Sequence, residues 1–171
     1  MGECEHHFVG SQSLTITNTR VTMSAPTTIS VSNSTLAIGV PLNLTSQLTK
    51  SGPGKLILSG INTNSGGVTL NAGTLTIGGP NPYAVFGTGT LTINGGNLDV
   101  TATTINANNN AMNWNGSFGY VGTGGNLTLG YGAVTLGANI TVTNSGASLK
   151  TLIVNGPITG PGYSLTKTGT G

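Results

Sequence analysis

The stretch that decides the fold runs from Leu48 to Gly78 and reads LTKSGPGKLILSGINTNSGGVTLNAGTLTIG. It holds three short runs in which branched aliphatic residues alternate with other residues: Leu56/Leu58, Val68/Leu70 and Leu75/Ile77. A period of two places each pair on one face of a β-strand. Glycines separate the runs and permit sharp turns through backbone angles that other residues avoid. We therefore predict short strands whose six aliphatic residues face a common core.

The same pattern extends beyond this stretch. From Leu14 to Leu48, apolar pairs begin every six to eight residues. Such spacing is compatible with a sandwich of hairpins or with the faces of a solenoid. Hairpins usually have longer strands joined by Asn-Gly or Asp-Gly turns, whereas these turns use single Ser, Asn, Pro or Gly residues. We predict an all-β fold, a right-handed parallel β-helix with about three short strands and roughly twenty residues per coil.

The composition supports an ordered, neutral solenoid. Only 5% of the residues are charged, 36% are hydrophobic and 29 are glycine. Low complexity and glycine favour disorder, but the regular spacing of Leu, Ile and Val argues for an ordered core. Outward Thr and Asn side chains are expected to form ladders of like residues from coil to coil. Identical charges stacked every ~4.8 Å would repel, which explains why charge is scarce.

The central stretch resembles the autotransporter-associated β-strand repeat, also called the passenger-associated transport repeat. Asn64 and Val68 depart from the usual pattern, where tyrosine and threonine are common. The resemblance implies a right-handed parallel β-helix in a large exported bacterial surface protein, located outside the cell or on its surface, and it provides no catalytic residue. The matching positions are Leu48, Lys50, Gly52, Gly54, Leu56, Leu58, Gly60, Asn62, Gly66, Gly67, Gly73 and Leu75.

We expect a single solenoid domain over residues 14–171. Near 107–125 the pattern weakens, and we expect an irregular, loop-rich segment there. Its three aromatic residues either form an exposed patch for sugars or fill the core of a wider coil, and we favour the core. Asp99 alternates with Leu98 and Val100, so we expect it to face solvent. The three aromatic residues are Trp114, Phe118 and Tyr120.

Residues 1–13 differ from the rest of the chain. Both histidines, the single cysteine and two of the three acids lie in the run from Glu3 to His7. Cys, His and Glu all bind zinc, but adjacent ligands without a second cluster do not complete a tetrahedral site. We therefore interpret residues 1–13 as a leader or flexible terminus rather than a metal site.

The sequence gives no support for catalysis or for several kinds of partner. Carbohydrate-cleaving enzymes use paired acids, and calcium sites need several oxygen ligands including carboxylates, yet Asp99 is the only acid beyond the amino terminus. We expect no enzyme activity, no cofactor and no metal. The five basic residues are scattered, which argues against nucleic-acid binding. No apolar run is long enough to span a membrane.

Three functions remain open. The first is a structural module, a rod segment of a surface stalk or of a self-assembling fibre. The second is an adhesin segment that binds glycans or host proteins. The third, which we favour least, is ice binding through threonine pairs, whose irregular separation in the chain argues against one aligned array. The pairs are Thr15/Thr17, Thr74/Thr76, Thr90/Thr92 and Thr141/Thr143.

The chain's ends suggest how the module extends. The opening phrase of the central stretch recurs as Leu165-Thr166-Lys167-Thr168-Gly169-Thr170-Gly171. A solenoid exposes strand edges and open core at its first and last coils unless they are capped. A strand at Leu14 and Ile16 of another copy therefore provides a continuation for the coil of Leu165, Lys167 and Gly171. The alternative is that flanking repeats of a longer chain provide it.

Overall fold

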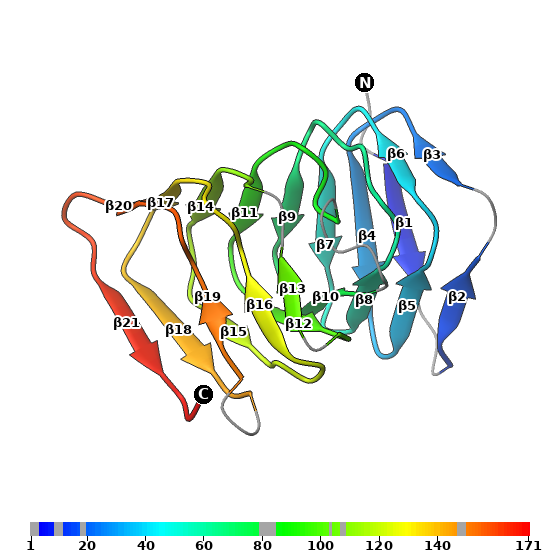
Figure 1. Cartoon of the computed structure of the whole chain (residues 1–171). Helices are drawn as coiled ribbons and strands as arrows, with labels where there is room; N and C mark the ends of the chain where they lie inside the picture. Colours follow the sequence, from blue (N-terminus) through cyan, green and yellow to red (C-terminus); the bar gives the residue numbers. More distant parts are fainter. Residues whose placement is uncertain are drawn as a thin grey trace.

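The computed structural model describes residues 4–8, 12–17, 20–78, 85–102, 104–106, 109–146 and 150–171. These residues contain strands and no helix, and the strands lie in parallel sheets that wind into a β-solenoid (Figure 1). This confirms the predicted fold class.

Two eight-stranded sheets run along the whole solenoid. Sheet A consists, in order, of β1 (Cys4–Phe8), β4 (Thr27–Val31), β7 (Leu48–Ser51), β9 (Val68–Leu70), β11 (Leu91–Ile93), β14 (Met112–Trp114), β17 (Val134–Leu136) and β20 (Ile158–Thr159). Sheet B consists of β2 (Leu14–Ile16), β5 (Thr35–Ile38), β8 (Lys55–Leu58), β10 (Thr74–Ile77), β12 (Asn97–Val100), β15 (Phe118–Tyr120), β18 (Ile140–Asn144) and β21 (Leu165–Thr168).

The third side of the solenoid is less regular. β3 (Val21–Met23) pairs with β6 (Leu42–Leu44) near the amino terminus. Nearer the carboxyl terminus, β13 (Thr104–Asn106), β16 (Asn126–Thr128) and β19 (Leu152–Ile153) form a three-stranded sheet. Between these two sheets, residues 61–64 follow the third side without forming a strand. The predicted three strands per coil are therefore present toward the two ends of the solenoid, whereas the described residues of the middle coils form two.

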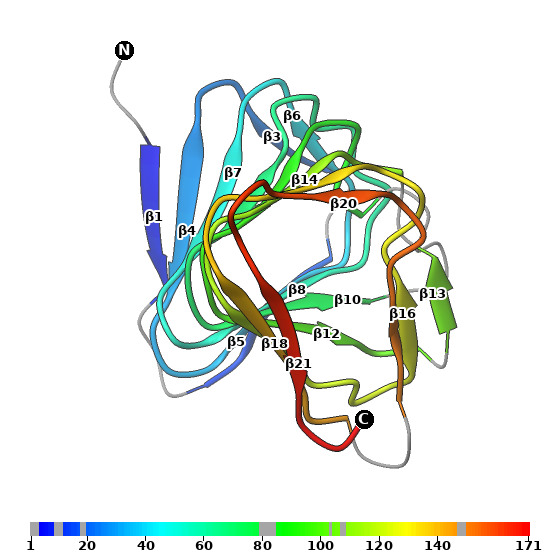
Figure 2. The ribbon, with the colours of Figure 1, turned by 90° about the vertical axis from the view of Figure 1, so that its left-hand side faces the viewer.

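The register fixes the length and hand of the coils. Partners on sheet A are separated by 20 residues at Leu48↔Val68 and by 24 at Val134↔Ile158, close to the predicted twenty. All the pairs are parallel, as expected when each coil returns to the same face. Figure 2 shows the chain passing from β19 to β20 to β21 anticlockwise while it advances toward the viewer, which is a right-handed coil.

The core lies between the sheets. Every second residue of a strand points its side chain into this core. The six aliphatic residues predicted to face inward, Leu56, Leu58, Val68, Leu70, Leu75 and Ile77, are all buried. Each stacks on its counterparts in neighbouring coils, as Leu75 does between Leu56 and Leu98. Burying one such side chain contributes about 1.5–3 kcal/mol.

The segment near 107–125 is more regular than we expected, because it contains β14 and β15. Its aromatic side chains lie in the core: Trp114, Phe118 and Tyr120 are all buried. Trp114 and Phe118 meet edge to face with ring centroids 5.0 Å apart, a favourable arrangement for two aromatic rings. The core-filling interpretation is therefore confirmed over the exposed sugar-binding patch.

The amino-terminal boundary also differs from our expectation. Residues 4–8, which we assigned to a leader, form β1, and β1 pairs with β4 over its whole length, from Cys4↔Thr27 to Phe8↔Val31. The structure does not describe the side chains of this run, so the interpretation that it is not a metal site stays a prediction. The backbone, however, extends the solenoid to Cys4.

The predicted outward ladders are present. On sheet A, Thr28, Thr49, Thr69 and Thr92 are register partners in successive coils. Beside this column, Asn94 donates from Nδ2 to Oδ1 of Asn71 at 2.7 Å, and Asn115 donates to Oδ1 of Asn94 at 3.1 Å. On the outer surface, hydrogen bonds between neutral side chains therefore connect the coils in addition to the backbone hydrogen bonds.

Candidate functional site

The residues of the predicted repeat motif form one coil and begin the next. Leu48 lies on β7, Leu56 and Leu58 on β8, and Leu75 on β10, and all four are buried in the core. The motif glycines lie in the turns and loops between these strands. The motif therefore combines core residues with turn residues, and it brings no reactive groups together.

Lys50 is the unexpected member of the motif, because its side chain is fully buried. In the register it lies between Ile29 and Leu70, which places it at a core-facing position of β7. Its Nζ donates to three backbone carbonyls, those of Ser51 at 2.5 Å, Gly52 at 2.7 Å and Ala72 at 3.1 Å. Burial lowers the pKa of Lys50 from 10.5 to about 8, because low-dielectric surroundings disfavour the charged form.

These hydrogen bonds depend on two glycine turns. Gly52 and Gly73 both have a φ of +72°, a left-handed conformation that glycine adopts without strain. A Cβ at Gly73 would collide with the carbonyl oxygens of Gly52 and Gly54 and would lie 2.8 Å from Nζ of Lys50. The glycines therefore let two successive turns approach one lysine. We call Lys50 with the carbonyls of Ser51, Gly52 and Ala72 the lysine corner.

Asn62, another residue of the motif, adds side-chain hydrogen bonds on the third side, where residues 61–64 form no strand. Its Oδ1 accepts from the backbone N–H of Leu42 at 2.8 Å, and its Nδ2 donates to the carbonyl of Val85 at 2.5 Å. Two residues further on in the same coil, Asn64 makes a similar contact and donates to the carbonyl of Phe86 at 3.0 Å. Buried amides thus bridge three coils where the described backbone forms no strand.

Asp99 contradicts our expectation of a solvent-facing acid, since only 1% of its surface is exposed. It does point away from the core, but the turn at Thr123 covers it. Its carboxylate accepts from the N–H of Thr123 at 2.8 Å, the hydroxyl of Thr123 at 2.9 Å and the N–H of Val100 at 2.9 Å, and it pairs with Lys55 at 3.2 Å. All the contacts are structural, and they fasten the turn to sheet B.

Tyr120 lies near this cluster. Its hydroxyl donates to the carbonyl of Gly125. Burial and, secondarily, the carboxylate of Asp99 raise the pKa of Tyr120. A phenol with a raised pKa stays protonated at neutral pH, so Tyr120 is not suited to act as a general base there.

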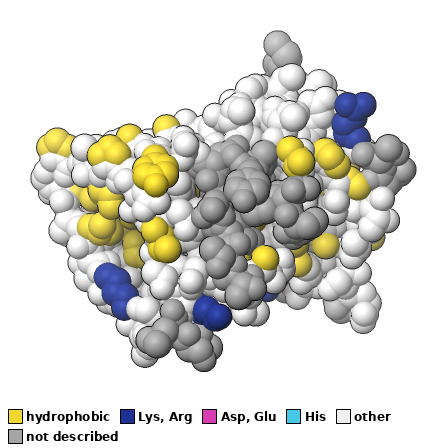
Figure 3. All heavy atoms as spheres, in the orientation of Figure 1, with side chains coloured by type: hydrophobic (Ala, Val, Ile, Leu, Met, Phe, Trp, Pro, Cys, Tyr) yellow, Lys and Arg dark blue, Asp and Glu magenta, His cyan; other side chains and the backbone are white. Residues whose placement is uncertain are grey.

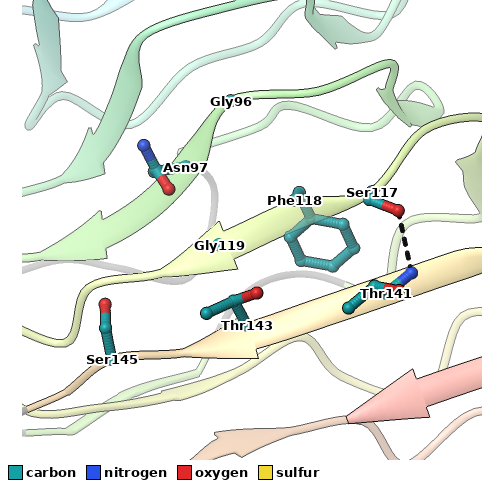
Figure 4. A pocket seen from close by; sticks show the side chains of 8 residues that line it. All are labelled: Gly96, Asn97, Ser117, Phe118, Gly119, Thr141, Thr143 and Ser145. Atoms are coloured by element: carbon teal, nitrogen blue, oxygen red, sulfur yellow. Dashed lines mark hydrogen bonds between the residues drawn. The ribbon is translucent and has the colours of Figure 1, made fainter. Parts of the chain in front are cut away.

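A shallow groove of about 390 Å³ lies on the outer face of sheet B (Figure 4). It forms where Gly119 interrupts a column of outward side chains that includes Asn97, Thr143 and Thr168. A Cβ at Gly119 would collide with Oδ1 of Asn97. The side chains around the groove are uncharged, and all of them except Phe118 carry hydrogen-bond donors or acceptors. They are those of Asn97, Ser117, Phe118, Thr141, Thr143 and Ser145.

The threonine pairs considered for ice binding do not share one face. Thr92 lies on β11 of sheet A, whereas Thr15, Thr74 and Thr141 lie on β2, β10 and β18 of sheet B. Thr76 is buried. The pairs therefore form no common array.

The residues that we named as assembly ends lie at opposite edges of sheet B. Leu14 and Ile16 belong to β2 at one edge, and Leu165 and Lys167 belong to β21 at the other. Leu14 is 45% exposed and Leu165 is 44% exposed. Figure 3 shows hydrophobic side chains gathered at the carboxyl-terminal end of the solenoid.

An apolar cavity of about 240 Å³ opens at this carboxyl-terminal end. Gly171, the last of the named end residues, lines it together with Lys167. Trp114 also lines it, and its Nε1 is buried without a hydrogen-bond partner among the described residues. The remaining walls are largely aliphatic and are formed by Val142, Leu152, Val154, Ile158 and Leu165.

Within the described residues, no three His, Cys, Asp or Glu side chains gather closely enough to bind a metal ion. The same part of the chain holds no helix with the length and apolar character needed to cross a bilayer.

Comparison with known families identifies the central coil. Residues 48–77 match the family model described as the passenger-associated-transport-repeat. This segment is a passenger-associated transport repeat. No curated protein and no solved structure matches the chain significantly. The repeat indicates a bacterial surface or secreted protein, and with the β-solenoid it fits a structural module of a passenger domain.

The echo of the repeat near the carboxyl terminus occupies a different sheet. Leu48 and Lys50 of the repeat lie on sheet A, whereas Leu165 and Lys167 lie on sheet B. The two phrases are therefore not stacked above one another. They share a local turn instead, since the lysine in each donates to the carbonyl of the glycine two residues on, Gly52 or Gly169.

Sequence reasoning missed the burial of Lys50 and Asp99. For Lys50 a signal was present, because Leu48 and Lys50 have the same spacing as Leu56 and Leu58, so a strand that buries Leu48 also turns Lys50 inward. For Asp99 the alternation was read correctly, but the covering turn at Thr123 comes from the following coil and leaves no mark near Asp99 in the sequence.

Proposed function

We propose that this chain is a non-enzymatic rod segment of a bacterial surface or secreted protein, and that the rod lengthens by stacking coil upon coil at its ends. The added coils come from flanking repeats or from further copies of the chain. The proposal rests on one observation: at the carboxyl-terminal end of the described solenoid, each of the two long sheets ends in an edge strand with an exposed apolar side chain, Ile158 on β20 and Leu165 on β21.

The geometry of the ends supports this proposal. Sheet A ends at β1 and β20, and sheet B ends at β2 and β21. An edge strand offers unpaired backbone N–H and C=O groups to another strand. All the described strand pairs are parallel. Moving one molecule along the solenoid axis therefore places its β2 beside β21 of another molecule, with the two strands running in the same direction. Such a contact repeats without closing and generates a linear assembly.

The outer surface supports a mechanical role. The threonine column of sheet A is neutral, and the asparagine ladder from Asn71 to Asn115 connects successive coils by side-chain hydrogen bonds. In a solenoid each unit contacts mainly its neighbours, so stability grows with the number of stacked units. A chain of this kind is suited to span distance rather than to hold a reaction centre.

Sedimentation velocity and electron microscopy over a range of protein concentrations test the proposal. We expect linear assemblies that lengthen with concentration. Leu165→Asp places a charge at the open end and is expected to weaken association by at least tenfold. Ile61→Asp is the matched control, because Ile61 is similarly exposed, at 49%, but lies on the third side, away from the ends. A wild-type chain that stays monomeric at every concentration contradicts growth by further copies and leaves flanking repeats as the source of the added coils.

The groove around Gly119 favours a second candidate, an adhesin segment that binds a neutral glycan. Its neutral hydroxyl and amide groups suit the hydroxyls of an uncharged sugar. Among the described residues, the amide of Asn97 has no hydrogen-bond partner, and this side chain is partly exposed. Binding to immobilised neutral oligosaccharides is the test. Asn97→Ala is expected to abolish binding, whereas Asn113→Ala on sheet A is expected to preserve it. Equal binding by both variants, or none by the wild type, contradicts this candidate.

A further inference from the structure

Two rungs of the asparagine ladder are followed by glycine, Asn94 by Gly95 and Asn115 by Gly116. In an Asn-Gly pair the peptide nitrogen of the glycine can attack the side-chain amide carbon of the asparagine, because no Cβ obstructs the approach. Both pairs lie at the corner that follows a strand of sheet A, and each has a described coil on either side. Their surroundings can therefore be compared directly.

The ladder holds the side chain of Asn94 at both of its polar atoms. Nδ2 of Asn94 donates to Oδ1 of Asn71 at 2.7 Å, and Oδ1 of Asn94 accepts from Nδ2 of Asn115 at 3.1 Å. Attack by the nitrogen of Gly95 requires the Asn94 side chain to turn toward its own backbone and to break both bonds. The N–H of Gly95 has no backbone acceptor among the described residues, but the amide carbon is held away from it.

The ladder ends at Asn115, because the next rung is a glycine. Trp114 and Leu136 are register partners. The residues that follow them, Asn115 and Gly137, lie side by side, and a Cβ at Gly137 would be 2.5 Å from Oδ1 of Asn115. Among the described residues, this Oδ1 has no hydrogen-bond partner, and the side chain is exposed. A single hydrogen bond, from Nδ2 to Asn94, restrains the amide of Asn115.

Gly116, which follows this less restrained amide, is required by the packing of the coils. A Cβ at Gly116 would collide with the carbonyl of Asn94. The N–H of Gly116 shares the carbonyl of Ile93 with the N–H of Asn115, and the bond from Gly116 is the longer of the two, at 3.2 Å against 2.8 Å. A long, shared hydrogen bond restrains the attacking nitrogen only weakly.

We propose that Asn115 and Gly116 form a self-modification site, at which the amide of Asn115 is converted to a carboxylate, and that the ladder protects Asn94 from the same reaction. The nitrogen of Gly116 loses its proton and bonds to Cγ of Asn115, and Nδ2 leaves with that proton as ammonia. Water then adds to one carbonyl of the resulting succinimide ring and opens it to aspartate or isoaspartate. Water is the co-reactant, and no oxidant or reductant takes part.

The reaction gives a negative charge to a neutral column and sets the direction of its hydrogen bonds. In the ladder, each amide donates toward the amino-terminal side, from Asn115 to Asn94 and from Asn94 to Asn71. A carboxylate only accepts hydrogen bonds. After conversion of Asn115 to aspartate, Asn94 must therefore turn its amide to donate to the carboxylate, and Asn71 must turn likewise. The ladder is retained with its hydrogen bonds reversed.

Peptide mapping by mass spectrometry tests the inference on the intact folded chain, incubated at neutral and at mildly alkaline pH. We expect Asn115 to be converted at least about fivefold faster than Asn94, because Asn94 must break one more hydrogen bond. In urea the two rates should become similar. Conversion should accelerate with pH, since the attacking nitrogen reacts without its proton. The third Asn-Gly pair of the chain, Asn155 and Gly156, yields a separate peptide and is scored on its own.

Three variants separate reactivity from protection. Asn71→Ala removes the acceptor of Nδ2 of Asn94 and should raise the conversion rate of Asn94 by about fivefold without changing that of Asn115. Asn97→Ala is the matched control, because Asn97 is a partly exposed asparagine on sheet B, outside the ladder, and it should change neither rate. Asn115→Gln keeps an amide but closes the corresponding ring far more slowly, so it should abolish the conversion at this position.

The outcomes are decided residue by residue. Conversion of Asn94 in the folded chain at the same rate as Asn115 or faster, or no conversion of Asn115, overturns the modification site. An Asn94 rate that Asn71→Ala leaves unchanged overturns the protective role of the ladder. Faster conversion of Asn115, together with the effect of Asn71→Ala on Asn94, supports both parts. None of these readouts depends on association of the chain, so they stand apart from the proposed end-to-end stacking.

Discussion

Lys55 and Asp99 form an ion pair that spans two coils of the solenoid. Nζ of Lys55 lies 3.2 Å from Oδ2 of Asp99, although 44 residues separate the two. Lys55 lies on β8 and Asp99 on β12, and β10 lies between them in sheet B. The pair therefore connects coils that share no backbone hydrogen bonds, and with Thr123 it extends this connection to a further coil.

Asp99→Ala is expected to destabilise the fold strongly. The substitution leaves the N–H groups of Val100 and Thr123 without their acceptor, and it leaves Lys55 without its partner. Each buried donor left unpaired costs about 1–3 kcal/mol, so the two N–H groups together account for about 2–6 kcal/mol. Urea unfolding measures the change. Asn113→Ala, an exposed change on sheet A, serves as control and should shift stability by less than ~0.5 kcal/mol. Equal effects of the two changes would show that the carboxylate does not fasten the turn.

Stability is expected to rise with pH between about pH 8 and pH 10.5 because of Lys50. Burial lowers the pKa of Lys50 from 10.5 to about 8, so in this window the unfolded chain binds more protons than the native one, and raising the pH favours the native state. The gain amounts to at most about 3 kcal/mol. Urea unfolding at several pH values measures the slope. Lys50→Met should remove the slope, and Arg20→Met, which removes an exposed cation, should keep it.

Gly73→Ala is expected to destabilise the fold by more than about 3 kcal/mol. The change combines an unfavourable positive φ with collisions against the carbonyls of Gly52 and Gly54. Gly162→Ala is the matched control, because Gly162 has a φ of +84° but no neighbour within 4 Å of the added Cβ. The control should lose only the ~1 kcal/mol of backbone strain. If thermal unfolding shows similar losses for both, the close approach of the two turns is unimportant.

Asn62→Ala is expected to cost about 2–3 kcal/mol. It removes the side-chain partners of the N–H of Leu42 and the carbonyl of Val85, and each buried group left unpaired costs about 1–3 kcal/mol. Hydrogen exchange should show faster exchange of the Leu42 amide in the variant. Unchanged protection of that amide would mean that another acceptor takes the place of Asn62.

The parts of this fold that the sequence predicts are those with a local cause. Alternation placed Leu56, Leu58, Leu75 and Ile77 in the core correctly because the period of a strand depends only on neighbouring residues. The burial of Asp99 depends on a turn 24 residues later, and no local pattern records it. β1 was missed for a similar reason, since its three middle residues, Glu5, His6 and His7, are polar and its assignment rests on pairing with β4.

The different placement of the two Leu-Thr-Lys phrases bears on how such rods present their surfaces. The phrase at Leu48 is on sheet A and the phrase at Leu165 is on sheet B. The number of residues per coil also varies along the chain. Equivalent positions of the sequence repeat therefore do not always fall on the same side of the coil. In a long passenger domain built from many such repeats, equivalent residues of successive repeats would lie on different faces of the solenoid. A flat surface that contacts one face would therefore meet only some of these equivalent residues.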